Sequence, residues 1–155
     1  MRLFAQLRKF INNLAQQPES EQAPDFTTAL AALMVEIMRA DGETHADECH
    51  MIARLLTQHS GISTQASELI RDQAISMVDE AIDLHRFVRV VNAHTGELER
   101  IEVIELLWLV AYADGSLDPH EEHMVRKIAG LLYVAHADFI SAKLTAREQL
   151  GLTDQ

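Results

Sequence analysis

The stretch Arg39-Ala40-Asp41-Gly42, followed by Glu48, decides the fold because it occurs twice. It returns 73 residues later as Tyr112-Ala113-Asp114-Gly115, followed by Glu121 at the same offset. A similarity that recurs at a fixed spacing is the mark of a repeated supersecondary unit. The motif therefore predicts a duplicated helix-loop-helix.

Apolar residues surround both copies of the motif at helical spacing. Ahead of the first copy they fall at i, i+3, i+4, i+7 and i+8, the pattern of one buried helix face. They are Leu30, Leu33, Met34, Ile37 and Met38. The same offsets are apolar ahead of the second copy. We expect each unit to be helix, short acidic loop, helix, with the two units packed about an approximate two-fold axis.

No segment alternates apolar and polar residues as a half-buried strand would, so the sequence predicts an all-α fold. We expect a compact bundle of seven to eight helices. Their expected ranges are 1–17, 25 or 27 to 39, 45–60, 63 or 64 to 78, 84–93, 97–112, 119–132 and 138–150. Trp108, in the most apolar of these, is expected in the core with a partner for its indole N–H.

Composition narrows the function classes. The chain has 155 residues and a formal net charge of −11, which disfavours nucleic-acid binding and favours a cationic partner or ion. The single Cys49 excludes an intramolecular disulfide and indicates a reducing, cytoplasmic location. Neither a Gly-x-Ser-x-Gly motif nor a phosphate-binding glycine loop occurs, so no enzyme is predicted.

The charge divides the chain into unequal parts. Residues 1–17 contain three basic and no acidic residues, which leaves 10 basic and 24 acidic residues, net −14, on the remainder. This amphipathic arm is expected either to pack on the body or to bind a membrane surface weakly, peripheral to the inner face. Residues 18–25 read as a linker, 26–150 as the helical domain and 151–155 as a tail.

The doubled Ala-Asp-Gly motif, with a glutamate seven residues after each aspartate, resembles the TerB-like family of tellurite resistance proteins. The resemblance spans about residues 26–150, and the same module occurs in DjlA-type co-chaperones. It implies a compact helical bundle, an association with tellurite resistance and stress responses, and a metal-related role. The His-Pro-Asp signature of a J-domain is absent from this sequence.

The acidic loops are candidate metal ligands. Carboxylate oxygens suit Ca²⁺ or Mg²⁺, and pseudo-symmetry would bring the two loops to one edge of the bundle. The candidate ligands are Asp41, Glu48, Asp114 and Glu121. The sequence favours helix capping and turn closure for the same acids, and both roles can hold together: Asp118-Pro119-His120-Glu121 has the form of a capping box, and Asp41 and Asp114 precede glycines.

The eight histidines form no recognised metal motif. His120 and His123 share one helix side, as do Asp47 and His50, which would allow adventitious Zn²⁺ or Ni²⁺ binding at the surface. The other histidines, His45 among them, are interpreted as solvated or helix-end residues.

The sequence predicts one of two functions. The first is a non-enzymatic stress-response module that binds a divalent cation, and the second is an interaction module with an acidic docking face and an N-terminal tether to an unidentified partner or membrane.

Overall fold

The computed structural model describes residues 24–152, and this part of the chain contains helices and no strand, as predicted. The expected helix at 1–17 and most of the expected linker lie outside the described residues. The described helices are α2 (Phe26–Met38), α3 (Ala46–Ser60), α4 (Thr64–Asp79), α5 (Leu84–Ala93), α6 (Glu97–Ala111), α7 (Pro119–Leu131) and α8 (His136–Gln149).

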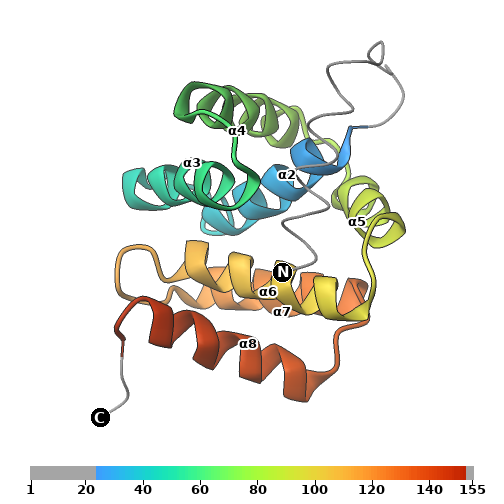
Figure 1. Ribbon diagram of the computed structural model, residues 1–155, viewed down its shortest axis with the longest axis vertical. Coiled ribbons are helices and arrows are strands. Elements are labelled where there is room, and N and C mark those ends of the chain that lie inside the picture. Colours follow the sequence, from blue (N-terminus) through green and yellow to red (C-terminus); the bar gives the residue numbers. More distant parts are fainter. Residues whose placement is uncertain (1–23, 153–155) are drawn as a thin grey trace.

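Two groups of three helices make up the bundle (Figure 1). Helices α2, α3 and α4 form the upper group, α6, α7 and α8 form the lower group, and α5 connects them. Within the groups, α4 packs on α2 and α8 packs on α6. Between the two groups, α2 contacts α6. The second helix of each group contacts the first helix of the other, since α3 touches α6 and α7 touches α2. The loops that follow α2 and α6 are thereby brought to the same end of the bundle.

All described helix ends lie within two residues of the expected positions, and α5 has the predicted bounds. The largest difference is at the start of α8, two residues earlier than expected. The sequence favoured Asp138 as the first residue, but the helix begins at His136 and Asp138 lies in its first turn. An acidic side chain stabilises the positive end of a helix from inside the first turn as well as from the cap, so the acid alone does not fix the boundary.

Helix α2 is buried on nearly all sides, whereas the sequence predicted a single buried face. Every residue from Phe26 to Met38 is buried except Glu36, which is half-buried. The reason is that α2 contacts five other helices, α3 to α7, and so has no side open to water. The α2 helix is the centre of the bundle, and its C-terminal end delivers the first acidic loop.

Helix α6 is covered by α8 through an aromatic cluster. Trp108 is fully buried and its indole N–H donates to the carbonyl oxygen of Phe139 over 3.2 Å, which confirms its expected place and its need for a partner. Lys143 of α8 lies 5.4 Å from the centroid of the Trp108 ring and Arg147 lies 5.2 Å from that of Tyr112. These cation–π contacts hold α8 against the helix that delivers the second acidic loop.

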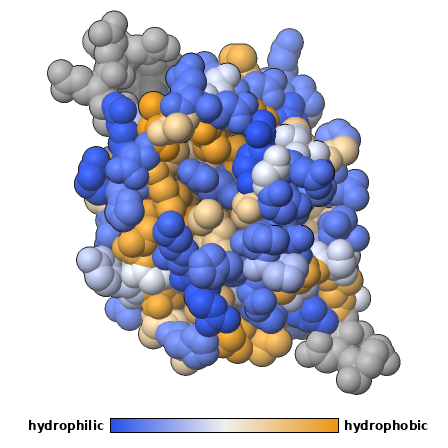
Figure 2. Space-filling model, turned by 180° about the vertical axis from the view of Figure 1, so that it is seen from behind, coloured by the Kyte–Doolittle hydropathy of each residue, from blue (hydrophilic) through white to orange (hydrophobic). Residues whose placement is uncertain are grey.

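The surface is chiefly hydrophilic on the face shown in Figure 2, where apolar residues form separate groups among polar ones. None of the helices between residues 24 and 152 combines the length and the apolar character needed to cross a membrane.

Candidate metal centre

The two loops share one turn. Asp41 Oδ1 accepts a hydrogen bond from the backbone N–H of Glu43, and Asp114 Oδ1 accepts one from the N–H of Ser116, both over 3.0 Å. The glycines that follow the two aspartates have φ angles of +83° and +89°. Only a residue without a Cβ adopts this left-handed conformation readily. The sequence therefore predicted turn closure by both aspartates correctly.

The second loop ends in a helix cap. Asp118 Oδ1 accepts hydrogen bonds from the backbone N–H groups of His120 and Glu121, over 2.7 and 3.4 Å, and Pro119 occupies the first helical position. The reciprocal half of the expected capping box is missing from the described contacts, because the Glu121 side chain accepts nothing from the Asp118 backbone. The carboxylate of Glu121 is left for another role.

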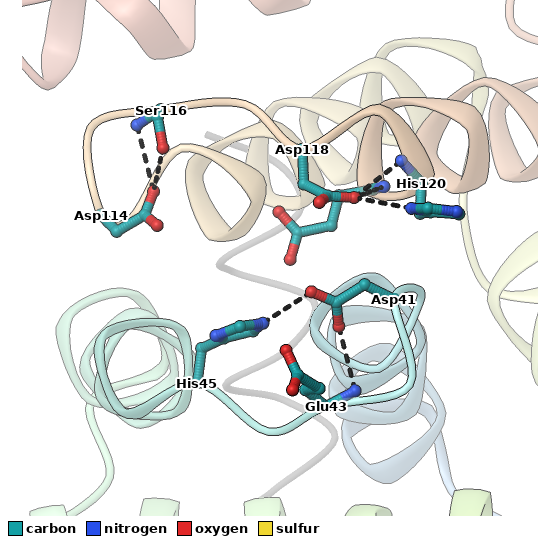
Figure 3. A network of polar contacts seen from close by, with 8 residues as sticks. Asp41, Glu43, His45, Asp114, Ser116, Asp118 and His120 are labelled. Carbon is teal, nitrogen blue, oxygen red and sulfur yellow. Dashed lines mark hydrogen bonds and ion pairs between the residues drawn. The ribbon is translucent and has the colours of Figure 1, made fainter.

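The first loop ends differently. His45 stands at the N-cap of α3 and makes no side-chain cap hydrogen bond. Its Nε2–H instead donates to Oδ2 of Asp41 over 2.7 Å, so the imidazole ring is held between the loop and the helix (Figure 3). This bond raises the pKa of His45, and it is the largest cause of the lowered pKa of Asp41.

The two loops face each other across a pocket of about 250 Å³ (Figure 3). Glu48 and Glu121 line it from the first turns of α3 and α7, and each is only 2% exposed. The complete lining is Asp41, His45, Glu48, Asp114, Ser116, Leu117, Asp118, Pro119 and Glu121. The packing of the two helix groups thus brings acids from distant parts of the sequence into one cavity.

Burial controls the charge of the two glutamates. Loss of hydration raises the pKa of the Glu48 carboxyl well above its usual value, and the neighbouring Glu121 raises it further through a hydrogen bond and its charge. Loss of hydration also raises the pKa of Glu121. Two adjacent carboxyls in a poorly hydrated site cannot both ionise at low free energy. The pair therefore retains a proton at neutral pH unless another cation replaces it.

Two groups of potential ligand atoms lie at this site among the described residues. One ring nitrogen of His45 and one oxygen each of Glu48 and Glu121 lie within 4.8 Å of one another. The same holds for Asp41, Glu43 and His45, which are more exposed. In the buried group, Oε1 of Glu48 is fully enclosed and has no hydrogen-bond partner in residues 24–152. A buried acceptor without a donor is destabilising, and a bound cation would satisfy it.

A family model matches this chain. Residues 27–144 match the model of the tellurite resistance protein TerB. This chain belongs to the TerB family. The match covers both acidic loops and all but the last turns of the described bundle, in agreement with the resemblance carried by the doubled motif.

One solved structure shares the fold of this TerB-family protein. It is the crystal structure of a protein of unknown function from Porphyromonas gingivalis W83, with a TM-score of 0.59 and 18% sequence identity. The alignment covers 85% of the present chain and 96% of the other. At this identity the likeness concerns the fold alone. Curated proteins gave no match.

All four predicted ligands of this TerB-family protein line the pocket, but in two different ways. Glu48 and Glu121 lie together in the buried group. Asp41 and Asp114 line the pocket from the two turns, where each already accepts a hydrogen bond from its own turn. Asp114 belongs to neither group of ligand atoms within the described residues.

The sequence interpretation missed His45, which it assigned to the solvated or helix-end histidines. His45 is at a helix end, but its ring also lines the pocket. The signal available was the spacing His45-x-x-Glu48, which places both side chains on one side of the helix start. That spacing attracts attention only once Glu48 is known to face a cavity.

Proposed function

We propose that this TerB-family domain is a non-enzymatic module that binds a divalent cation between its two acidic loops. The observation that carries the proposal is the pair of buried glutamates, Glu48 and Glu121, with one carboxylate oxygen of Glu48 lacking a partner. Taken alone, the carboxylates of the pocket supply the hard oxygen ligands that suit Ca²⁺ or Mg²⁺.

The free energy of burial supports this reading. An acid without compensation is destabilising in a core, whereas a leucine or methionine at the same position would be favourable. The helix cap does not require Glu121, because Asp118 already accepts hydrogen bonds from the first turn of α7. A cation that joins the two carboxylates supplies the reason for their position.

The family match supports a role linked to tellurite resistance, and the net charge bears on how direct that role is. Tellurite is an oxyanion, and the body of this protein has a net charge of −14 outside residues 1–17, with 10 basic and 24 acidic residues. Such a body attracts cations and repels anions. We therefore place the domain in a cation-linked step of a cytoplasmic stress response, with no direct contact to tellurite.

The test is thermal unfolding of chelator-stripped protein during titration with Ca²⁺, Mg²⁺, Mn²⁺ and Zn²⁺. Wild type should show a saturable rise in Tm with at least one ion, since a ligand that binds only the folded state stabilises it. Glu48→Gln should abolish the rise. Glu68→Gln, at an exposed position on α4, is the matched control and should respond as wild type does.

The double variant Asp41→Asn/Asp114→Asn measures the contribution of the two turn aspartates. It should weaken the response without abolishing it, because both aspartates close turns. A flat response of wild-type protein to every ion would overturn the proposal and leave all four acids as turn, cap and buried structural residues.

The second candidate function is an interaction module whose acidic face docks a basic protein segment. The open pocket of about 250 Å³ favours it, because an arginine or lysine side chain of a partner would neutralise the same glutamates. The two functions are separated by the titration. If the ions do not raise Tm but a lysine- or arginine-rich peptide does, and Glu48→Gln removes that effect, the cation is a partner's side chain. A tether at residues 1–17, to a partner or a membrane surface, belongs to this second proposal.

A further inference from the structure

One of the positions at which the two loops differ places a histidine at the pocket. Residues 45 and 118 are equivalent under the 73-residue repeat, and they are histidine and aspartate. Asp118 accepts hydrogen bonds from the backbone of α7 and so serves the helix. His45 makes no cap bond and lies with its ring at the pocket. The asymmetry adds one imidazole to a pocket whose other ionisable side chains are all carboxylates.

The imidazole is close enough to share an ion with the buried glutamates. One nitrogen of His45 and one oxygen each of Glu48 and Glu121 lie within 4.8 Å of one another. Two ligands of a tetrahedral Zn²⁺ ion are about 3.4 Å apart, since each bond is about 2.1 Å long. Side-chain rotations that bring the donors up to about 1.4 Å closer together would therefore close them around one ion.

Two further observations point to a ligand at this place. Glu48 lines the pocket, and its Oε1 is enclosed and has no hydrogen-bond partner within the described chain. The His45 ring is held by Asp41, whose Oδ2 accepts its N–H over 2.7 Å. Because Asp41 holds Nε2–H, the ion would bind the other ring nitrogen, Nδ1; a carboxylate on one ring nitrogen is the usual support of an imidazole whose other nitrogen binds a metal. The exposed group of Asp41, Glu43 and His45 has no buried donor of this kind.

We propose that the pocket selects a first-row transition ion of the Zn²⁺ or Fe²⁺ class, with His45, Glu48 and Glu121 as its protein ligands and Asp41 as the residue that orients His45. This inference rests on the proposed cation binding and narrows the class of ion. Imidazole suits zinc and iron, whereas Ca²⁺ and Mg²⁺ prefer oxygen ligands throughout. With three protein ligands, a tetrahedral ion would keep one coordination position for water or another ligand.

The test compares His45→Asn with His120→Asn in the full chain. His120 is a matched control because its Nδ1 also pairs with an aspartate, Asp118, over 3.2 Å, but its side chain is 71% exposed and does not line the pocket. Binding of Zn²⁺, Co²⁺, Ca²⁺ and Mg²⁺ is measured by calorimetry on chelator-stripped protein. The visible absorption of bound Co²⁺ reports a nitrogen ligand independently of affinity.

Wild type should bind Zn²⁺ and Co²⁺ more tightly than Ca²⁺. His45→Asn should weaken Zn²⁺ binding at least about tenfold and shift the Co²⁺ spectrum, while Ca²⁺ affinity changes by less than about threefold. His120→Asn should match wild type in every measurement. Far-UV circular dichroism checks that each variant is folded.

Three outcomes would overturn the inference. If His45→Asn leaves the Zn²⁺ affinity and the Co²⁺ spectrum unchanged, the ion is held by oxygen alone, and cation binding itself survives. If His120→Asn removes the Zn²⁺ signal, the ion binds the exposed histidines of α7 adventitiously. If no ion binds and Glu48→Gln has no effect, the proposed function fails together with the inference.

Discussion

The loop after α2 and the loop after α6 share the same local structure and differ at one step of it. Each has an aspartate that accepts a hydrogen bond from the backbone two residues on, a glycine with positive φ, and a glutamate in the first turn of the next helix that is only 2% exposed. They differ at the N-cap. The second loop caps its helix with Asp118, and the first replaces the cap by His45, whose ring bonds Asp41.

This difference separates what the fold requires from what the pocket requires. The turn occurs in both loops because each chain reversal needs it. The side-chain cap occurs only in the second loop, so α3 forms without one. A helix that gives up a cap loses about 1 kcal/mol of stability. The first loop lacks this stabilising cap and instead has an imidazole beside the buried glutamates. Under the proposed cation binding, a capping side chain at position 45 would favour the helix, whereas a histidine would favour the ion.

The largest expected effect is the pH dependence of the folding stability of the metal-free protein. Because the pKa of Glu48 is raised on folding, the folded state binds more protons than the unfolded state above the ordinary glutamate pKa of 4.5. Stability should therefore fall as pH rises from about 5 to 8, by up to about 1.4 kcal/mol per pH unit. Urea unfolding in chelator at several pH values measures it.

Glu48→Gln is the control for that titration. The amide keeps the size and the hydrogen-bonding capacity of the protonated acid, so the slope should largely disappear and stability at pH 8 should rise. A wild-type slope that persists in Glu48→Gln would show that another group controls it.

The next effect is expected to be equal in the two loops. Gly42→Ala and Gly115→Ala should each destabilise the protein by about 1 to 2 kcal/mol, because an alanine at positive φ is strained although no atom obstructs its Cβ. Gly130→Ala is the control, since it lies near the end of α7 with open space and no positive φ. It should be neutral or stabilising. Chemical denaturation measures all three variants, and unequal losses at Gly42 and Gly115 would break the equivalence of the turns.

A smaller effect should distinguish the caps. Asp118→Ala should reduce stability by about 1 kcal/mol, because two backbone N–H groups at the start of α7 lose their acceptor. His45→Ala should cost less than half as much, since only a partly exposed ion pair with Asp41 is lost. Equal losses in metal-free protein would mean that His45 supports its helix as strongly as the aspartate does.

The smallest expected effect has the opposite sign. His45→Ser places a good capping side chain at the start of α3 and should stabilise the metal-free protein by about 0.5 kcal/mol. The same variant should lose the Zn²⁺-induced rise in Tm. Thermal unfolding with and without Zn²⁺ gives both results, and a variant that is destabilised without metal would contradict the view that His45 displaces a cap.

Much of the fold could be predicted from the sequence because its signals are local. Apolar spacing located the helices, Gly61 correctly ended α3, and Asp118-Pro119 correctly began α7. The two-residue difference at the start of α8 arose because an acid stabilises several positions of a first turn. The burial of α2 on nearly all sides could not be predicted, since it depends on the five helices that surround it.

The candidate site could be predicted only in part. The repeat singled out Glu48 and Glu121 as equivalent acids, but spacing alone could not separate a capping glutamate from one that faces a cavity. His45 was missed for the same reason. A histidine at a helix start is ordinary until a buried carboxylate from another helix is found beside it.

By itself the sequence determined the all-helical class, the doubled Asp-Gly turn and the membership in the TerB family, because each depends on residues that are close together in the chain. Only the tertiary structure decided that α3 and α7 point Glu48 and Glu121 into one pocket, that both carboxylates lose their water there, and that His45 joins them. Proximity and desolvation are properties of packed helices, and residue spacing within one helix does not record them.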